Sequence, residues 1–126
     1  MKKFALISLA AVGAAMLITW TSASTVGATV AAEETITGRL VEAGCAAMGG
    51  AEPSAEHVAC MVRCAKNGDP IGILTADGLI KITGDWAATH ADALSDLMAK
   101  QVRATGETSE AGGETLLDVS TIELAK

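Results

Sequence analysis

The sequence predicts a small, mainly β domain with two helices, built as a five-stranded barrel with one helix inserted between strands one and two. Two observations predict it: β-branched segments separated by turn residues, and two amphipathic segments that lie between them in the order strand, helix, hairpin, helix, hairpin. An open α+β sandwich is the alternative architecture for the same elements.

The leader has the pattern of a secretory signal. Lys2 and Lys3 precede an uncharged run to Ala32, and the small residues Val30-Ala31-Ala32 before Glu33 fit a cleavage site. We therefore expect an exported, periplasmic or secreted protein with one domain over 33–126. Contact with a membrane is expected only if the leader stays uncleaved.

Composition narrows the partners of this domain. Removing residues 1–32 from the 126 leaves 94, and the loss of Lys2 and Lys3 leaves 7 Lys and Arg against 15 Asp and Glu, a net charge of −8. The only aromatic residue beyond the leader is Trp86, which we expect to plug the barrel. Binding of nucleic acid needs a basic surface and stacking rings, so we expect none.

The first half of the domain divides into a strand, a loop and a helix. β-branched residues over 35–43 predict a strand, with a bend or bulge at Gly38. The glycine-rich stretch 44–53 is a predicted loop. Ser54 is a suitable N-cap and Asn67-Gly68 a suitable stop, which predicts a helix over 55–66.

Two hairpins and a second helix complete the domain. Residues 71–76 and 79–84 flank Asp77-Gly78, a predicted two-residue turn. Thr89, with Asp92 three residues later, predicts the start of a helix over 90–100. The final hairpin is expected to pair residues 101–108 with 115–124 through a looser loop over 109–113. This element order is that of an OB-like barrel, in which the connection between strands one and two borders the usual ligand face.

The chemistry of the chain lies in that inserted helix. His57, Cys60, Met61 and Cys64 stand at relative positions 0, +3, +4 and +7, which is one helical face. The remaining cysteine, Cys45, lies in the preceding loop together with Met48. The fold can therefore bring all three thiols to one point.

Two metal ions suit this set of side chains. Cys45, His57, Cys60 and Cys64 form a Cys3His set, which is the ligand number of a structural zinc site. Copper(I) accepts two to four soft ligands and also methionine sulfur, which would make Met61 an optional ligand. We therefore expect a soft metal ion, copper(I) or zinc, held for carriage, sensing or stabilisation, with a protein partner for metal transfer.

Two other readings of the thiols remain open. Exported cysteines commonly oxidise, so Cys45 can pair with Cys60 or Cys64 and staple a non-enzymatic module for a protein or saccharide partner. Thiol catalysis by Cys60 beside His57 is the third reading. Its only orienting acid would be Glu56, and the chain contains no Cys-x-x-Cys, so the sequence predicts no complete catalytic mechanism.

A resemblance extends this interpretation. Cys45, then His57-x-x-Cys60-x-x-x-Cys64, then Gly68-Asp69-Pro70-Ile71-Gly72 resemble a group of small exported bacterial proteins of unassigned role, over most of residues 36–124. Similar sequences have an aromatic residue directly after the first cysteine, where this chain has Ala46. The resemblance implies a small β domain with a Cys/His cluster and implies no activity.

Overall fold

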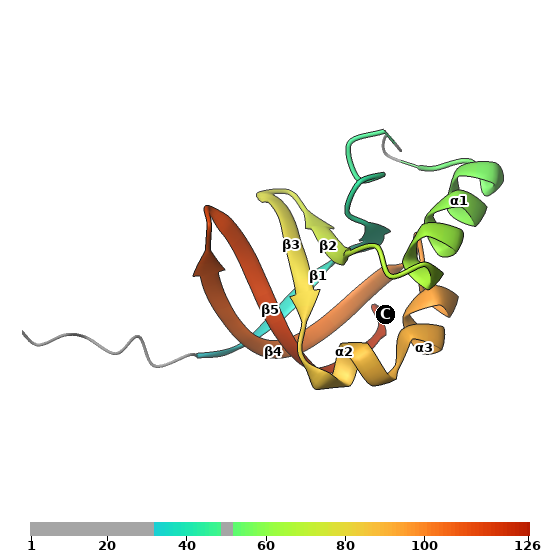
Figure 1. Cartoon of the computed structure of the whole chain (residues 1–126). Coiled ribbons are helices and arrows are strands. Elements are labelled where there is room, and N and C mark those ends of the chain that lie inside the picture. The colour runs from blue at the N-terminus through green and yellow to red at the C-terminus, as the bar shows by residue number, and fades with distance from the viewer. Residues whose placement is uncertain (1–31, 49–51) are drawn as a thin grey trace, which may run out of the picture.

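Five strands close into a barrel in the order β1-β2-β3-β5-β4 in the computed structural model, which describes residues 32–48 and 52–126 (Figure 1). The mainly β, OB-like barrel with a helix between the first two strands is therefore confirmed. The leader and its cleavage site lie outside the described residues, apart from Ala32. The elements are β1 (Glu33–Glu42), α1 (Ala55–Lys66), β2 (Ile71–Thr75), β3 (Gly78–Thr83), α2 (Asp85–Thr89), α3 (Ala91–Asp96), β4 (Gln101–Ala111) and β5 (Glu114–Leu124).

Strand β1 joins the two halves of the barrel. Its first part, Glu33 to Arg39, pairs antiparallel with β4, and Arg39 to Glu42 pair with β2. Gly38 stands just before this change of partner, where a Cβ would lie 2.5 Å from the carbonyl oxygen of Leu74. The pairing shows no register shift at Gly38, so this glycine allows a close approach between strands and carries no bulge.

Two clusters of buried side chains form the interior. The larger one fills the barrel, and its inward positions on β4 alternate as expected for a strand with one buried face. The smaller one lies beneath α1, where α1 also packs against α3 (Figure 1). The barrel cluster is Leu40, Ile73, Leu94, Val102, Ala104, Leu117 and Val119, and the smaller cluster is Val41, Cys45, Met61, Ala65 and Met98.

Both hairpin turns differ from the sequence-based prediction. Thr75 pairs with Gly78, so the first turn is Ala76-Asp77, one residue earlier than predicted. The Thr75 hydroxyl explains the shift, because it accepts from the Asp77 N–H at 3.2 Å and donates to the Gly78 carbonyl at 3.0 Å. The second turn is tighter than the predicted loop over 109–113. It consists of Gly112-Gly113, whose φ values of 61° and 80° suit a two-residue hairpin.

The predicted helix over 90–100 was wrong in its extent. Only α3, over Ala91–Asp96, lies within this span, and a separate short helix, α2, precedes it over Asp85–Thr89. Thr89 does not act as an N-cap, because its hydroxyl donates back to the carbonyls of Asp85 and Trp86. The second helix ends at Asp96, and Ala99 takes a φ of 64°, which turns the chain into β4.

Trp86 packs against the barrel cluster and stacks on His90, with ring centroids 4.2 Å apart. Its half-buried position on α2 is consistent with the predicted plug of the barrel. Over residues 32–48 and 52–126, none of the helices is long and apolar enough to cross a membrane.

Candidate thiol site

The predicted bounds of α1 are confirmed, and its two ends fix which face meets the barrel. The Ser54 hydroxyl accepts from the His57 N–H at 3.2 Å, which caps the first turn. At the other end Gly68 adopts a φ of 97°, and the Asp69 N–H donates to the Cys64 carbonyl at 3.1 Å. The helix is thereby held with Met61 and Ala65 on its buried side.

Cys60 and Cys64 lie one helical turn apart and are both half-buried. Burial raises the pKa of the Cys64 thiol, and the neighbouring Cys60 thiol raises it further through its charge and a hydrogen bond. All three cysteines of the chain are free thiols in this structure.

Cys45 lies opposite this pair, in the turn that follows β1. It is buried, with 6% of its surface exposed, and belongs to the cluster beneath α1. Its thiol is close enough to those of Cys60 and Cys64 for their charges to raise its pKa. Cys45 in the loop and the two cysteines of α1 are thus electrostatic neighbours, and their convergence at one point stays a prediction.

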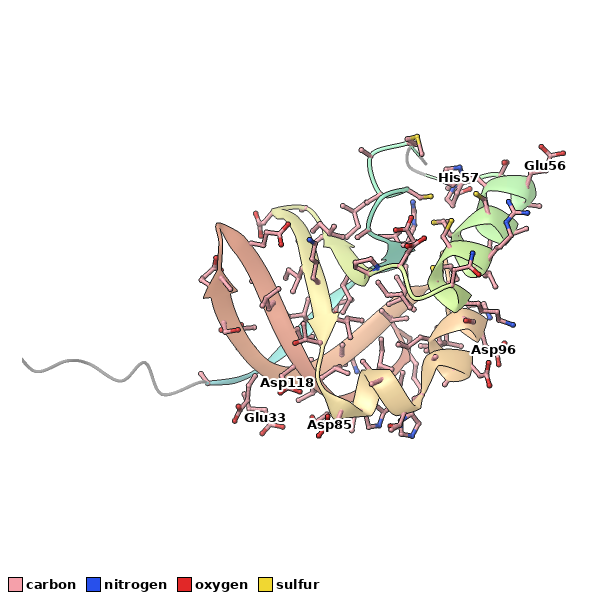
Figure 2. All side chains as sticks on the ribbon, in the orientation of Figure 1. Glu33, Glu56, His57, Asp85, Asp96 and Asp118 are labelled. Atoms are coloured by element: carbon pink, nitrogen blue, oxygen red, sulfur yellow. The ribbon has the colours of Figure 1, made fainter. Side chains whose placement is uncertain are left out.

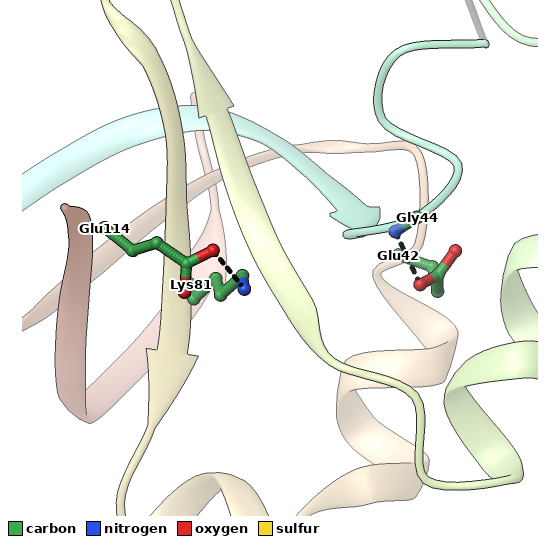
Figure 3. A network of polar contacts seen from close by, with 4 residues as sticks. All are labelled: Glu42, Gly44, Lys81 and Glu114. Atoms are coloured by element: carbon green, nitrogen blue, oxygen red, sulfur yellow. Dashed lines mark hydrogen bonds and ion pairs between the residues drawn. The ribbon is translucent and has the colours of Figure 1, made fainter. Parts of the chain in front are cut away.

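A buried carboxylate holds Cys45 in place. Glu42, 5% exposed at the end of β1, accepts from the Gly44 N–H at 2.7 Å through one oxygen and from the Cys45 N–H at 2.8 Å through the other (Figure 3). The Cys45 thiol donates a third hydrogen bond to the same carboxylate. Figure 3 also shows a separate ion pair of the barrel, Lys81 with Glu114 at 2.6 Å.

These contacts shift two pKa values in opposite directions. Burial acts to raise the pKa of Glu42, but the hydrogen bonds from the Cys45 thiol and the two N–H groups outweigh it, so the pKa is lowered. The hydrogen bond to Glu42, followed by burial, raises the pKa of the Cys45 thiol to about 12. Glu42 is therefore ionised and Cys45 a neutral thiol at pH 7.

His57 lies on the side of α1 that faces the loop after β1 (Figure 2). Its Nε2 is buried and has no hydrogen-bond partner among the described residues. A buried ring nitrogen without a partner carries a desolvation cost that a proton donor or a metal ion would remove. Glu56 points away from His57 into solvent (Figure 2), so it does not orient this imidazole.

The two methionines near the site differ in position. Met61 is 1% exposed and packs in the same cluster as Cys45, which is the environment of a core side chain. Met48 is 71% exposed, three residues beyond Cys45. His90, the other histidine, lies away from the thiols, where its Nδ1 contacts the Trp86 carbonyl at 2.8 Å.

Within residues 32–48 and 52–126, no three His, Cys, Asp or Glu side chains are arranged in a geometry that would hold a metal ion. The donors are nevertheless of the right kind. Two contacting thiols and a buried, unpartnered imidazole nitrogen belong to one helical face, and soft metal ions prefer sulfur and imidazole ligands.

Sequence reasoning missed Glu42, which lies within the predicted first strand. Nothing in its local pattern distinguishes it from a solvated strand residue, because its burial depends on the tertiary fold around the end of β1. The available signal was its position, since Glu42 is followed by Gly44 and Cys45 and a carboxylate there can accept from the next free backbone N–H groups.

Comparison of the chain with protein-family models, with curated proteins and with solved structures found no match.

Proposed function

We propose that this protein binds a soft metal ion, copper(I) or zinc, at the cluster formed by Cys45, His57, Cys60 and Cys64, as an exported carrier, sensor or metal-stabilised domain. The observation that carries the proposal is the buried His57 Nε2, which has no hydrogen-bond partner among the residues that the structure describes and shares a helical face with the thiols of Cys60 and Cys64. Met61 stays an optional ligand, since it would have to turn out of its buried cluster to contribute.

The chemistry of the donors supports a soft ion. Thiolate sulfur and imidazole nitrogen suit zinc and copper(I), whereas calcium and magnesium take oxygen ligands. The only buried carboxylate among the described residues, Glu42, already accepts three hydrogen bonds. The site therefore offers sulfur and nitrogen rather than oxygen.

The position of the site in the fold supports binding. The loop after β1 and helix α1 together form the connection between the first two strands (Figure 1). In OB-like barrels this connection borders the face where ligands commonly bind. An ion held there would lie where a second protein could reach it for transfer.

The proposal is tested by purifying the full chain without reductant and measuring its bound metal and its number of free thiols. Bound copper or zinc, with thiols that react only after a chelator is added, would support the proposal. The occupancy should fall in acid, because the ligands must lose their protons to bind. His57→Ala should lower the occupancy, and His90→Ala is the matched control, since His90 lies away from the thiols.

The competing function has a distinct outcome in the same experiment. A disulfide from Cys45 to Cys60 or Cys64, with one thiol left over and no metal bound at neutral pH, would overturn metal binding and leave a stapled binding module. Turnover of a disulfide substrate by metal-free protein, abolished in Cys60→Ser, would instead support thiol catalysis.

A further inference from the structure

We propose that the first half of β1 is a docking edge for a partner protein, which adds to the barrel an extended segment of alternating basic and apolar side chains. This docking edge is the side of residues 33–38 that faces away from β4, together with the groove beside it. It includes none of the proposed metal ligands, so the inference goes beyond the proposed function and does not depend on it.

The docking edge exists because β2 is only half as long as β1. Strand β2 has five residues, β1 has ten, and the two pair only over positions 39–42 of β1. Positions 33–38 pair with β4 on one side, and no other described strand pairs with them. An unpaired strand edge is a template for a further strand.

The backbone groups that face the docking edge can be assigned. Leu40 donates to the Lys100 carbonyl and accepts from the Ala99 N–H, so its backbone groups face the start of β4. Backbone groups of successive residues in a strand point to opposite sides, and the pairing of β1 with β4 shows no register shift. The N–H and C=O groups of Thr35 and Thr37 therefore face the docking edge, and both residues are exposed.

A groove of about 320 Å³ lies beside this edge. It is lined by Ile36 and Thr37 of β1, by the hairpin of β2 and β3 around its turn, and by Thr115 of β5. Ile36 and Ile80 are half-buried and pack against the barrel cluster, so they make the inner side of the groove apolar. A residue of an added strand that lies opposite Ile36 would be apolar, and the residues before and after it would face outward.

Carboxylates on the outer face of the sheet favour a basic partner. Glu33 lies directly opposite Glu107 of β4, which in turn lies opposite Asp118 of β5. All three are exposed and border one depression of about 340 Å³, and Figure 2 shows Glu33 and Asp118 at the same end of the barrel. None of them forms an ion pair with a described residue. Like charges on opposite residues destabilise a sheet, so basic side chains of an added strand would relieve a repulsion.

The same charges disfavour a second copy of this chain as the occupant. The domain over 33–126 has 7 Lys and Arg against 15 Asp and Glu, so its copies repel one another. Charged side chains on an exposed strand edge commonly protect it from pairing with itself. A segment rich in Lys or Arg is attracted to the same surface.

The experiment titrates the full chain with a synthetic peptide of Lys-Val repeats that is long enough to span residues 33–38, by calorimetry and by amide hydrogen exchange. We expect binding with slower exchange of the Thr35 and Thr37 N–H groups and unchanged exchange of the Ile36 N–H, which faces β4. The control peptide is methylated on the backbone nitrogens of its lysines, which face β1 in the proposed pairing. A second control is a Glu-Val repeat. Neither should bind.

Variants separate the backbone edge from the charges. Thr37→Pro removes an N–H that faces the docking edge and spares the bonds to β4, so it should weaken peptide binding by about 10-fold. Glu33→Gln combined with Glu107→Gln keeps the size of both side chains and should weaken binding by about 5-fold at low salt. Glu56→Gln, the matched control, removes an exposed carboxylate of α1 and should have no effect.

Three results would overturn the inference. The first is no binding of the Lys-Val peptide, which would leave the carboxylates as a guard of the edge alone. The second is equal binding of the methylated peptide, which decides against strand addition even if Thr37→Pro does not fold. The third is slow exchange of the Thr35 and Thr37 N–H groups without peptide, because the edge would then already be covered. Sedimentation would assign that cover to a second copy in a dimer or to the preceding segment in a monomer.

Discussion

Replacing Glu42 by Gln tests the arrangement that positions Cys45. Each carboxylate oxygen accepts from one N–H group, at 2.7 Å from Gly44 and 2.8 Å from Cys45. Gln has a single acceptor oxygen, so its NH2 group must face one of these two donors. The substitution changes neither the length nor the shape of the side chain, which isolates the effect of the second oxygen and the charge.

The magnitude follows from these contacts. A hydrogen bond to a charged acceptor contributes about 1.5–3 kcal/mol. Gly44 is exposed and can bond to water, and the Cys45 N–H keeps a longer contact of 3.2 Å to the Glu42 carbonyl, so the loss is partly offset. We expect Glu42→Gln to lower the free energy of unfolding by about 1–3 kcal/mol. For a domain of this size that is a fall in Tm of about 5–20 °C.

The effect should depend on pH with a defined sign. The pKa of Glu42 is lower in the folded protein than its ordinary value of 4.5, so its stabilisation is fully present above that value and is lost as the pH falls through the folded pKa. The assay is urea unfolding of the full chain at a series of pH values, with Glu123→Gln as control. Glu123 is exposed and its oxygen lies 3.8 Å from Arg103, so its replacement should cost less than about 0.5 kcal/mol.

Two results would refute this reasoning. The first is an equal free energy of unfolding for Glu42→Gln and Glu123→Gln at pH 7. It would mean that the two N–H contacts of the Glu42 carboxylate contribute little to stability. A stability gap between wild type and Glu42→Gln that stays constant below pH 4.5 would mean that the lowered pKa does not stabilise the fold.

Three further predictions follow from the described contacts. Gly106→Ala places a Cβ 2.1 Å from the Asp118 carbonyl oxygen and should prevent folding. Gly113→Ala is the control, since its Cβ meets no atom within 4 Å; urea unfolding should show a loss of only about 1 kcal/mol in the free energy of unfolding. At pH 8 a thiol with a pKa of about 12 is ionised in about one molecule in 10,000, so iodoacetamide should label Cys45 far more slowly than Cys60. Mass spectrometry of the labelled protein measures the two rates, and equal rates would contradict this prediction. His90→Ala should cost about 0.5 kcal/mol through the lost ring stack, and no change in the urea midpoint would contradict it.

The parts of the fold that were predictable from sequence are those set by neighbouring residues. Helix α1 has its predicted bounds because Ser54 caps it and Asn67-Gly68 ends it locally. The first hairpin shifted by one residue because the Thr75 hydroxyl fixes the turn, which a pattern of turn residues does not reveal. The prediction that a helix extends to residue 100 was wrong, because Ala99 adopts a left-handed conformation that alanine rarely takes.

The same distinction applies to the candidate site. The common face of His57, Cys60 and Cys64 follows from helical periodicity, so spacing alone predicted it. The role of Glu42 depends on its burial and on the turn after β1 that brings two N–H groups to its carboxylate, and no local pattern contains that information. The sequence therefore identified the thiols and the imidazole of the candidate site, but it could not show which thiol forms a hydrogen bond with a buried carboxylate.

Glu42 also separates the two uses of Cys45. A disulfide from Cys45 to the helix would remove the thiol proton that Glu42 accepts, whereas a copper(I) ion on Cys60 and Cys64 would leave that hydrogen bond in place. Weakening the bond should therefore favour oxidation of Cys45 and should have little effect on copper(I). We expect Glu42→Gln to form the Cys45 disulfide faster than wild type on exposure to a small-molecule disulfide, by mass spectrometry of the alkylated protein. Faster oxidation with unchanged copper(I) affinity would place Cys45 outside the metal site, and parallel loss of copper(I) affinity would place it inside.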